Sequence, residues 1–193
     1  MRVALLFLLA AASAFAQRPS FGIKAGVPFT DLVKSESWKN GMYRPTSSRY
    51  TIGPTIELLL PFRLSIEFDA LYRPVEYRLL SVGATGQSID ASGSAWLFPL
   101  LAKYRLSRRF VAPYLAAGLA FNRLSGLKQL GDLDKATVSG LVAAVGLEGR
   151  LPVGRISPEI RYTRWSSDNL RNLSGGFGLS NRTQIEALVG ITF

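Results

Sequence analysis

Charged residues recur at every second position in several stretches of this chain, and their types limit the chemistry they could perform. Glu67 and Asp69 are two residues apart, as are Lys103 and Arg105. The chain has no histidine, so a Ser-His-Asp triad is impossible, and a general base near neutral pH would need a strongly shifted carboxylate or lysine. We therefore expect the acidic residues to form ion pairs with the basic ones rather than to take part in catalysis.

Three short motifs could carry chemistry, and each also fits an ordinary loop. Trp165-Ser166-Ser167-Asp168 holds a nucleophile and an acid, but it follows a predicted strand, where turn residues are common. Asp132 and Asp134 could hold Ca²⁺ weakly, yet their spacing does not fit an EF-hand loop. The glycine-rich segment 175–178 lacks the strand-to-helix context of a phosphate loop. We expect no catalytic residues, no metal site and no cofactor.

The elements that position the charges alternate with a period of two, which indicates β-strands. Eight strands are predicted, at residues 19–29, 49–60, 63–77, 94–106, 111–123, 136–151, 155–165 and 184–193. A helical period would scatter Arg63, Glu67 and Asp69 around the apolar face of the third segment. The predicted fold class is therefore all-β, an eight-stranded antiparallel up-and-down transmembrane barrel in one domain, residues 17–193.

The connections between these strands are of two kinds. Those after the second, fourth and sixth strands are short, whereas the others are long, at residues 30–48, 78–93, 124–135 and 166–181. Short turns at one rim and long loops at the other, with an even strand count, are typical of single-chain outer-membrane barrels. Because the chain has no cysteine, strand pairing and burial must hold the fold without disulfides.

Alternation alone does not decide which face points outward. A soluble lipocalin-like barrel would hold its apolar residues inside. An apolar exterior is favoured because the other face carries charges of both signs and most of the strand glycines, as a crowded polar interior requires. We expect a lumen filled by polar side chains, with a charge network formed by Lys24, Glu57, Arg63, Glu67, Asp69, Lys103, Arg105, Glu148, Glu159, Arg161 and Glu186.

Aromatic residues on the apolar face lie near the strand ends, where they would meet the two membrane interfaces. The predicted girdle consists of Phe29, Tyr72, Trp96, Phe121 and Tyr162 toward the long loops, and of Phe110 and Phe193 toward the short turns.

The net charge of +10 comes from basic residues that gather near the two rims. At the long-loop rim, arginines could contact lipopolysaccharide phosphates through charge-assisted hydrogen bonds. Four are candidates for this contact, namely Arg49, Arg123, Arg164 and Arg182. A generic basic surface is the alternative. Nucleic acid is not an expected partner, because no base-stacking platform is visible.

The first residues of the chain indicate export. Met1-Arg2 is followed by an apolar run and by Ala14-Phe15-Ala16, the arrangement of a signal peptide with an A-x-A cleavage site. The run is too short for a spanning helix, which needs about 20 residues. We expect a signal peptide at residues 1–16, cleavage after Ala16 and location in the outer membrane of a Gram-negative envelope.

The last strand strengthens this interpretation. Ile185, Ala187, Val189, Ile191 and Phe193 form one apolar stripe. Together with the strand pattern and the segment 112–119, this ending resembles the small outer-membrane β-barrel families that include the membrane domain of outer-membrane protein A and its barrel-only relatives. The resemblance implies that the stripe is an assembly signal read by the barrel-assembly machinery.

Three functions are compatible with the sequence. The first is a non-enzymatic, monomeric barrel in contact with outer-membrane lipids and lipopolysaccharide, which supports the envelope or presents its loops for interaction. The second is a narrow porin-like channel for small solutes, which the polar inner face permits but paired charges would block. The third is a soluble lipocalin-like binding barrel.

Overall fold

The computed structural model describes residues 19–30, 37–38, 41–45, 50–81, 88–107, 109–125, 137–166 and 182–193. The predicted signal peptide and Arg49 lie outside these residues, as do the predicted loop motifs at 131–134 and 175–178. Among the described residues, no helix is long and apolar enough to cross a membrane.

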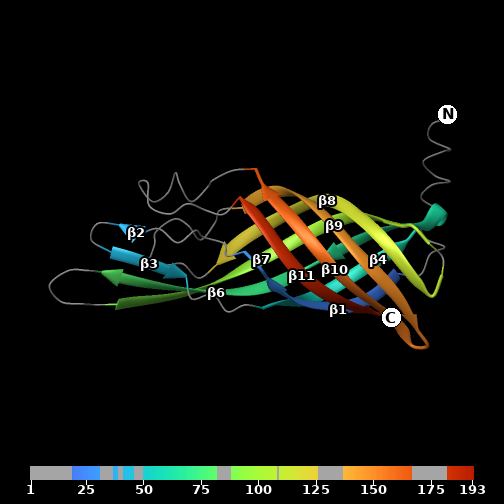
Figure 1. Cartoon of the computed structure of the whole chain (residues 1–193), viewed down its shortest axis with the longest axis horizontal. Coiled ribbons are helices and arrows are strands. Elements are labelled where there is room, and N and C mark those ends of the chain that lie inside the picture. The colour runs from blue at the N-terminus through green and yellow to red at the C-terminus, as the bar shows by residue number, and fades with distance from the viewer. Residues whose placement is uncertain are drawn as a thin grey trace.

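Antiparallel strands close on themselves into a barrel (Figure 1). Its strands are β1 (Pro19–Pro28), β4 (Thr51–Leu59), β5 (Leu64–Asp69), β6 (Leu71–Ser81), β7 (Ser88–Arg105), β8 (Val111–Ser125), β9 (Thr137–Leu151), β10 (Gly154–Trp165) and β11 (Thr183–Thr192). Strand β1 pairs with β11 on one side and with β4 on the other, which completes the ring. Strands β5 and β6 both lie between β4 and β7 and together form one strand of the wall. The barrel therefore has eight strands, and the predicted fold class is confirmed.

The break between β5 and β6 falls at Ala70, next to a glycine of β4. The Ala70 amide donates to the Pro54 carbonyl at 3.0 Å, so the two strands remain joined there. A Cβ atom at Gly53 would overlap the carbonyl oxygen of Ala70. The absence of a side chain at Gly53 therefore allows the close approach of the two backbones.

The turn from β4 to β5 is a short 3-10 segment, Pro61–Arg63. Phe62 and Arg63 have φ angles of 60° and 69°, in the left-handed region that costs energy for residues with a Cβ. The Leu60 amide donates to the Leu64 carbonyl at 2.9 Å and closes the turn. Residues in this turn consequently leave the alternation of the strands on either side.

Strands extend beyond the barrel at the long-loop end, within two of the predicted long loops. Pairing of β6 with β7 continues to Leu80 and Ser88, so the predicted loop at 78–93 is wrong over most of its length. Within the predicted loop 30–48, β2 (Ser37–Trp38) and β3 (Gly41–Pro45) form strands, and β3 pairs with β6. Pairing of this kind satisfies backbone amides and carbonyls that a long loop would leave to water.

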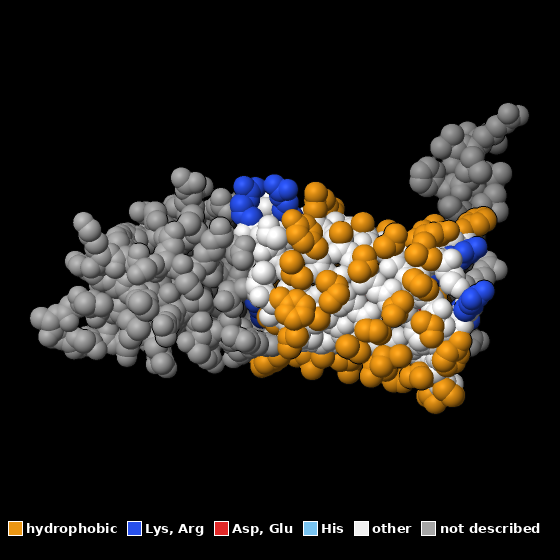
Figure 2. Space-filling model, in the orientation of Figure 1, with side chains coloured by type: hydrophobic (Ala, Val, Ile, Leu, Met, Phe, Trp, Pro, Cys, Tyr) orange, Lys and Arg blue, Asp and Glu red, His pale blue; other side chains and the backbone are white. Residues whose placement is uncertain are grey.

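The barrel has an apolar exterior and a charged interior. On β1, Ile23 is 61% exposed, whereas its neighbour Lys24 is 1% exposed. Apolar side chains cover the outside of the wall along its length, and basic side chains lie at both ends of this belt (Figure 2). This arrangement excludes a lipocalin-like barrel, in which apolar side chains would face inward.

A charge placed on the apolar belt tests this orientation. Val145 lies at the middle of β9 on the outer wall, and Val153 lies in the turn after β9. We expect Val145→Arg to lower the free energy of unfolding in phospholipid vesicles by about 2–4 kcal/mol and Val153→Arg by about 0–1 kcal/mol. Equal losses in denaturant titrations of the two variants would contradict a lipid-facing wall.

Candidate functional site: a charged lumen and a basic rim

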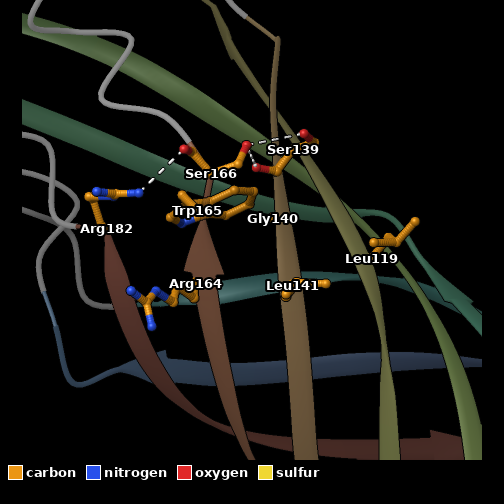
Figure 3. A pocket seen from close by; sticks show the side chains of 8 residues that line it. All are labelled: Leu119, Ser139, Gly140, Leu141, Arg164, Trp165, Ser166 and Arg182. Carbon is orange, nitrogen blue, oxygen red and sulfur yellow. Dashed lines mark hydrogen bonds between the residues drawn. The ribbon is translucent and has the colours of Figure 1, made fainter.

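The predicted site residues lie in three regions: the rim at the long-loop end, the outer wall and the interior of the barrel. At the rim, Arg164 from β10 and Arg182, just before β11, are exposed and line the same pocket (Figure 3). Arg123 is exposed on β8 and does not line this pocket. The structure therefore brings together two of the four arginines that we predicted to contact lipopolysaccharide.

Predicted girdle residues lie on the outer wall. Phe29, Phe110 and Phe193 are 63 to 70% exposed, and the rings of Tyr72 and Trp96 meet edge to face at 5.3 Å between centroids. The remaining members, Phe121 and Tyr162, are 41% and 40% exposed. Phe98, which the alternation puts on the same face but which is not in the predicted girdle, stacks on Trp96 at 6.2 Å between centroids.

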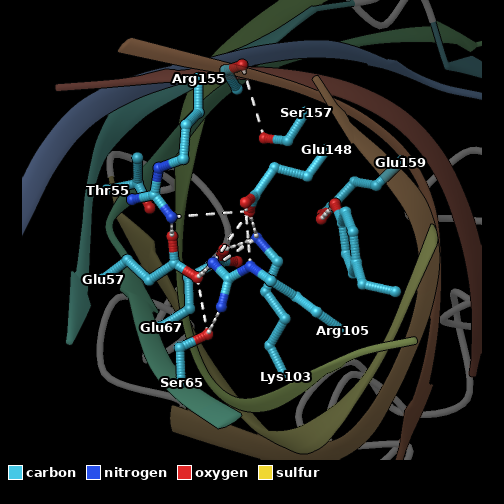
Figure 4. A network of polar contacts seen from close by, with 12 residues as sticks. Thr55, Glu57, Ser65, Glu67, Lys103, Arg105, Glu148, Arg155, Ser157 and Glu159 are labelled. Carbon is cyan, nitrogen blue, oxygen red and sulfur yellow. Dashed lines mark hydrogen bonds and ion pairs between the residues drawn. The ribbon is translucent and has the colours of Figure 1, made fainter. Parts of the chain in front are cut away.

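In the lumen, one ionic cluster lies toward the short turns (Figure 4). Arg105 binds Glu148 in a bidentate manner, with nitrogen to oxygen distances of 2.9 and 2.8 Å, and also binds Glu57 at 2.6 Å. Glu57 accepts a further hydrogen bond from the Ser65 hydroxyl at 2.6 Å and forms an ion pair with Arg155 at 3.0 Å. Two-pronged arginine to carboxylate contacts of this kind fix orientation as well as charge.

A second cluster lies deeper in the barrel. Arg161 forms ion pairs with Asp69 at 2.7 Å and with Glu159 at 2.6 Å. Lys24 reaches into the same cluster from β1, where it contacts Glu67 and lies 3.4 Å from Asp69 and 3.3 Å from Glu159. Each carboxylate therefore has more than one cationic partner, which is the condition for keeping charges in a buried site.

Lys103 connects the two clusters. Its ammonium nitrogen lies 3.2 Å from Glu67 of the deeper cluster, and 3.5 and 3.7 Å from Glu57 and Glu148 of the turn-side cluster. It also lies 4.2 Å from the ring centroid of Tyr114, whose hydroxyl donates to Glu159 at 2.7 Å. The two clusters form one continuous network across the lumen.

A further ion pair, of which our sequence prediction included Glu186 but not Arg73, lies closer to the long loops. Arg73 is 3.4 Å from Glu186 and donates to the Thr30 carbonyl at 3.0 Å. Arg155, another member of the network, was also missing from the prediction, although the alternation with Ser157 and Glu159 places it on the inner face.

Positive and negative groups balance in this network. Its cations are Lys24, Arg73, Lys103, Arg105, Arg155 and Arg161, and its anions are Glu57, Glu67, Asp69, Glu148, Glu159 and Glu186. Their side chains are at most 15% exposed, so an uncompensated charge here would be costly. Among the described residues, the network therefore contains six cationic and six anionic side chains.

Arg63 does not belong to the network, and its inclusion in the prediction was wrong. It is exposed in the turn after β4, and its guanidinium donates to the Leu106 carbonyl at 2.9 Å. The positive φ of the turn ends the alternation that the prediction had extended from Ser65 back to Arg63.

The inner face is also less polar than predicted. Leu71, Leu97, Leu101, Val142 and Trp165 are buried there, with exposures of 0 to 4%, and pack into one apolar cluster. The expectation of a lumen filled throughout by polar side chains is wrong for this part. The aliphatic members fill the narrow interior of an eight-stranded barrel without needing hydrogen-bond partners, whereas the indole nitrogen of Trp165 is buried with no hydrogen-bond partner among the described residues.

Removal of one buried cation tests the network. We expect Arg161→Met to cost about 3–5 kcal/mol of unfolding free energy, because Asp69 and Glu159 lose a partner while remaining buried. Arg63→Met is the matched control, since it removes an exposed arginine and is expected to change stability by less than about 0.5 kcal/mol. Equilibrium unfolding in detergent measures both, and similar losses would contradict a network that depends on burial.

Comparisons with known proteins agree with this architecture. The family model for an outer membrane protein beta-barrel domain matches residues 3–193. No curated protein matches the chain. The crystal structure of the outer membrane protein OprG from Pseudomonas aeruginosa is similar, with a TM-score of 0.51 and 12% identity over 91% of this chain and 94% of that chain.

The crystal structure of the N-terminal beta-barrel domain of Pseudomonas aeruginosa OprF is also similar, at a TM-score of 0.44 and 15% identity, covering 92% of this chain and 99% of that chain. At 12% identity, the OprG structure shows the fold alone. The match to the family model extends over nearly the whole sequence, including every strand of the barrel. The chain therefore belongs to the outer membrane protein β-barrel domain family.

Proposed function

We propose that this protein is a non-enzymatic outer-membrane barrel with a sealed lumen, which acts in the envelope through its wall and its long loops. The observation that carries this proposal is the balanced ionic network. It draws side chains from β1, β4, β5, β7, β9 and β10 into contact across the interior. Side chains that meet across an eight-stranded barrel occupy the space through which a solute would pass.

The burial of the network supports a plug more than a pore. Lys24, Lys103 and Arg161 are 1 to 2% exposed, so they have almost no contact with solvent. A conducting lumen would instead leave charged side chains hydrated along a continuous path. The apolar cluster around Leu101 and Val142 further narrows the hydrated part of the interior.

Conductance in planar bilayers distinguishes the plug from the narrow channel. We expect the purified protein to show no stable opening events. The double variant Arg105→Ser/Glu148→Ser removes both members of the bidentate pair and leaves Glu57 paired with Arg155 and Lys103. The deeper cluster around Arg161 stays in place, so this variant, like Arg63→Ser outside the network, is also expected to show no stable steps. Reproducible steps in the unaltered protein would favour the channel and overturn the plug.

We also propose that the protein is exported and assembled through its two ends. The closing stripe is well placed for recognition, because Val189, Ile191 and Phe193 are 44 to 70% exposed on the outer wall. Ile185 and Ala187 continue it on the same face. The stripe thus presents a continuous apolar face that the assembly machinery could bind. Phe193 also exchanges two backbone hydrogen bonds with Phe21 of β1.

The cleavage site can be tested directly. If residues 1–16 are a signal peptide, protein isolated from the outer-membrane fraction begins at Gln17. Mass spectrometry of the intact protein measures this, and Ala16→Leu, which spoils the A-x-A site, is expected to retain the leader. A mature protein that still begins at Met1 would contradict the proposed cleavage.

A further inference from the structure

The pocket at the long-loop rim lies where three neighbouring strands bring basic, hydroxyl and apolar groups together on the outer wall (Figure 3). The register of β8, β9 and β10 aligns Leu119, Leu141 and Arg164 in one row across the wall. Ser139 of β9 and Ser166 after β10 lie next to this row on the loop side, and their hydroxyls are 3.3 Å apart.

The base of the pocket is firmly built. Trp165 is 3% exposed and packs against Gly140, where a Cβ atom would lie 2.8 Å from the indole Cε3. The Ser166 amide donates to the Ser139 carbonyl at 3.0 Å, and the Ser166 hydroxyl donates to the same carbonyl at 2.7 Å. These contacts hold the end of β10 against β9 and fix the two hydroxyls at the rim.

The chemistry of the lining is one-sided. Arg164 and Arg182 contribute two guanidinium groups, and Arg182 donates to the Ser166 carbonyl at 3.3 Å, which holds it over the pocket. No Asp or Glu is among the described residues that line the pocket. Two guanidinium groups with no acid beside them suit the oxygens of a phosphate group.

The surroundings indicate what carries the phosphate. Leu119 and Leu141, which lie beside the basic groups, are 49% and 65% exposed on the apolar belt. The site therefore has an anion-binding half at the rim and an apolar half on the wall. A ligand that fits both halves has a phosphorylated head group and hydrocarbon chains, as a lipid of the membrane around the barrel does.

We propose that this pocket is a binding site for a phosphorylated lipid of the leaflet at the long-loop end, with the phosphate at Arg164 and Arg182 and an acyl chain along Leu119 and Leu141. The proposal rests on the membrane placement of the barrel but not on the sealed lumen. It also narrows the broader expectation of lipopolysaccharide contacts to one place in the fold.

Native mass spectrometry of the full chain in detergent tests the site, with diphosphorylated lipid A as the probe. We expect bound lipid A to survive on the unaltered protein and to bind at least about tenfold more weakly to Arg164→Gln/Arg182→Gln, since two charge-assisted contacts are lost. The matched control is Arg109→Gln/Arg150→Gln, which removes the same charge at the opposite rim and is expected to bind as the unaltered protein does. Arg164→Gln alone serves if the double variant fails to fold.

Two further probes identify the ligand. Lipid A from which both phosphates have been removed is expected to bind at least about tenfold more weakly. Inorganic phosphate at millimolar concentration is expected not to displace lipid A. Equal binding of the phosphorylated and dephosphorylated lipids, equal losses in the two double variants, or displacement by inorganic phosphate would each overturn the proposal. None of these results bears on conductance, so failure here is distinguishable from failure of the sealed lumen.

Discussion

The structure depends on the requirement that every charge inside the barrel meets an opposite charge. Moving an ion from water into a dry interior is costly, and the attraction of a partner offsets this cost only when the geometry is close. Arg105 meets this condition through its bidentate contact with Glu148, and Arg161 through Asp69 and Glu159. Because partners come from strands far apart in sequence, the network can form only when the barrel is closed.

The exterior follows from the same separation of environments. Because successive side chains of a strand point to opposite faces, the residues between the charged ones have their side chains on the outer surface of the barrel. Ile66 and Phe68, which flank Glu67, are 41% and 42% exposed. The many exposed apolar side chains of the chain agree with its family, the outer membrane protein β-barrel domains. Among the residues that the structure describes, exposed basic groups lie near the two ends of this belt, as Arg164 and Arg182 do at the pocket.

Most of the fold and much of the lumen follow from alternation, because a period of two predicts both that a segment is a β-strand and which of its side chains lie on the same face of the sheet. Lys24 and Glu186 were placed correctly by this rule alone. The same rule failed at Arg63, where a turn with positive φ interrupts the strand. The predicted strand 155–165 already contained Arg155 and Trp165, and the same rule places both on the inner face, although we assigned neither of them to the lumen. Pairing of β3 with β6 could not be foreseen, because it depends on how backbones meet beyond the barrel.

The most direct test of the account is the reactivity of Lys24 and Lys103, the buried lysines of the described part of the chain, with a water-soluble amine reagent, followed by peptide mass spectrometry. Lys24 and Lys103 are 1% and 2% exposed and held by carboxylates from other strands. The account predicts that both react at least about tenfold more slowly in the folded barrel than in urea. Equal labelling of either lysine in the two states would contradict an interior closed by paired charges.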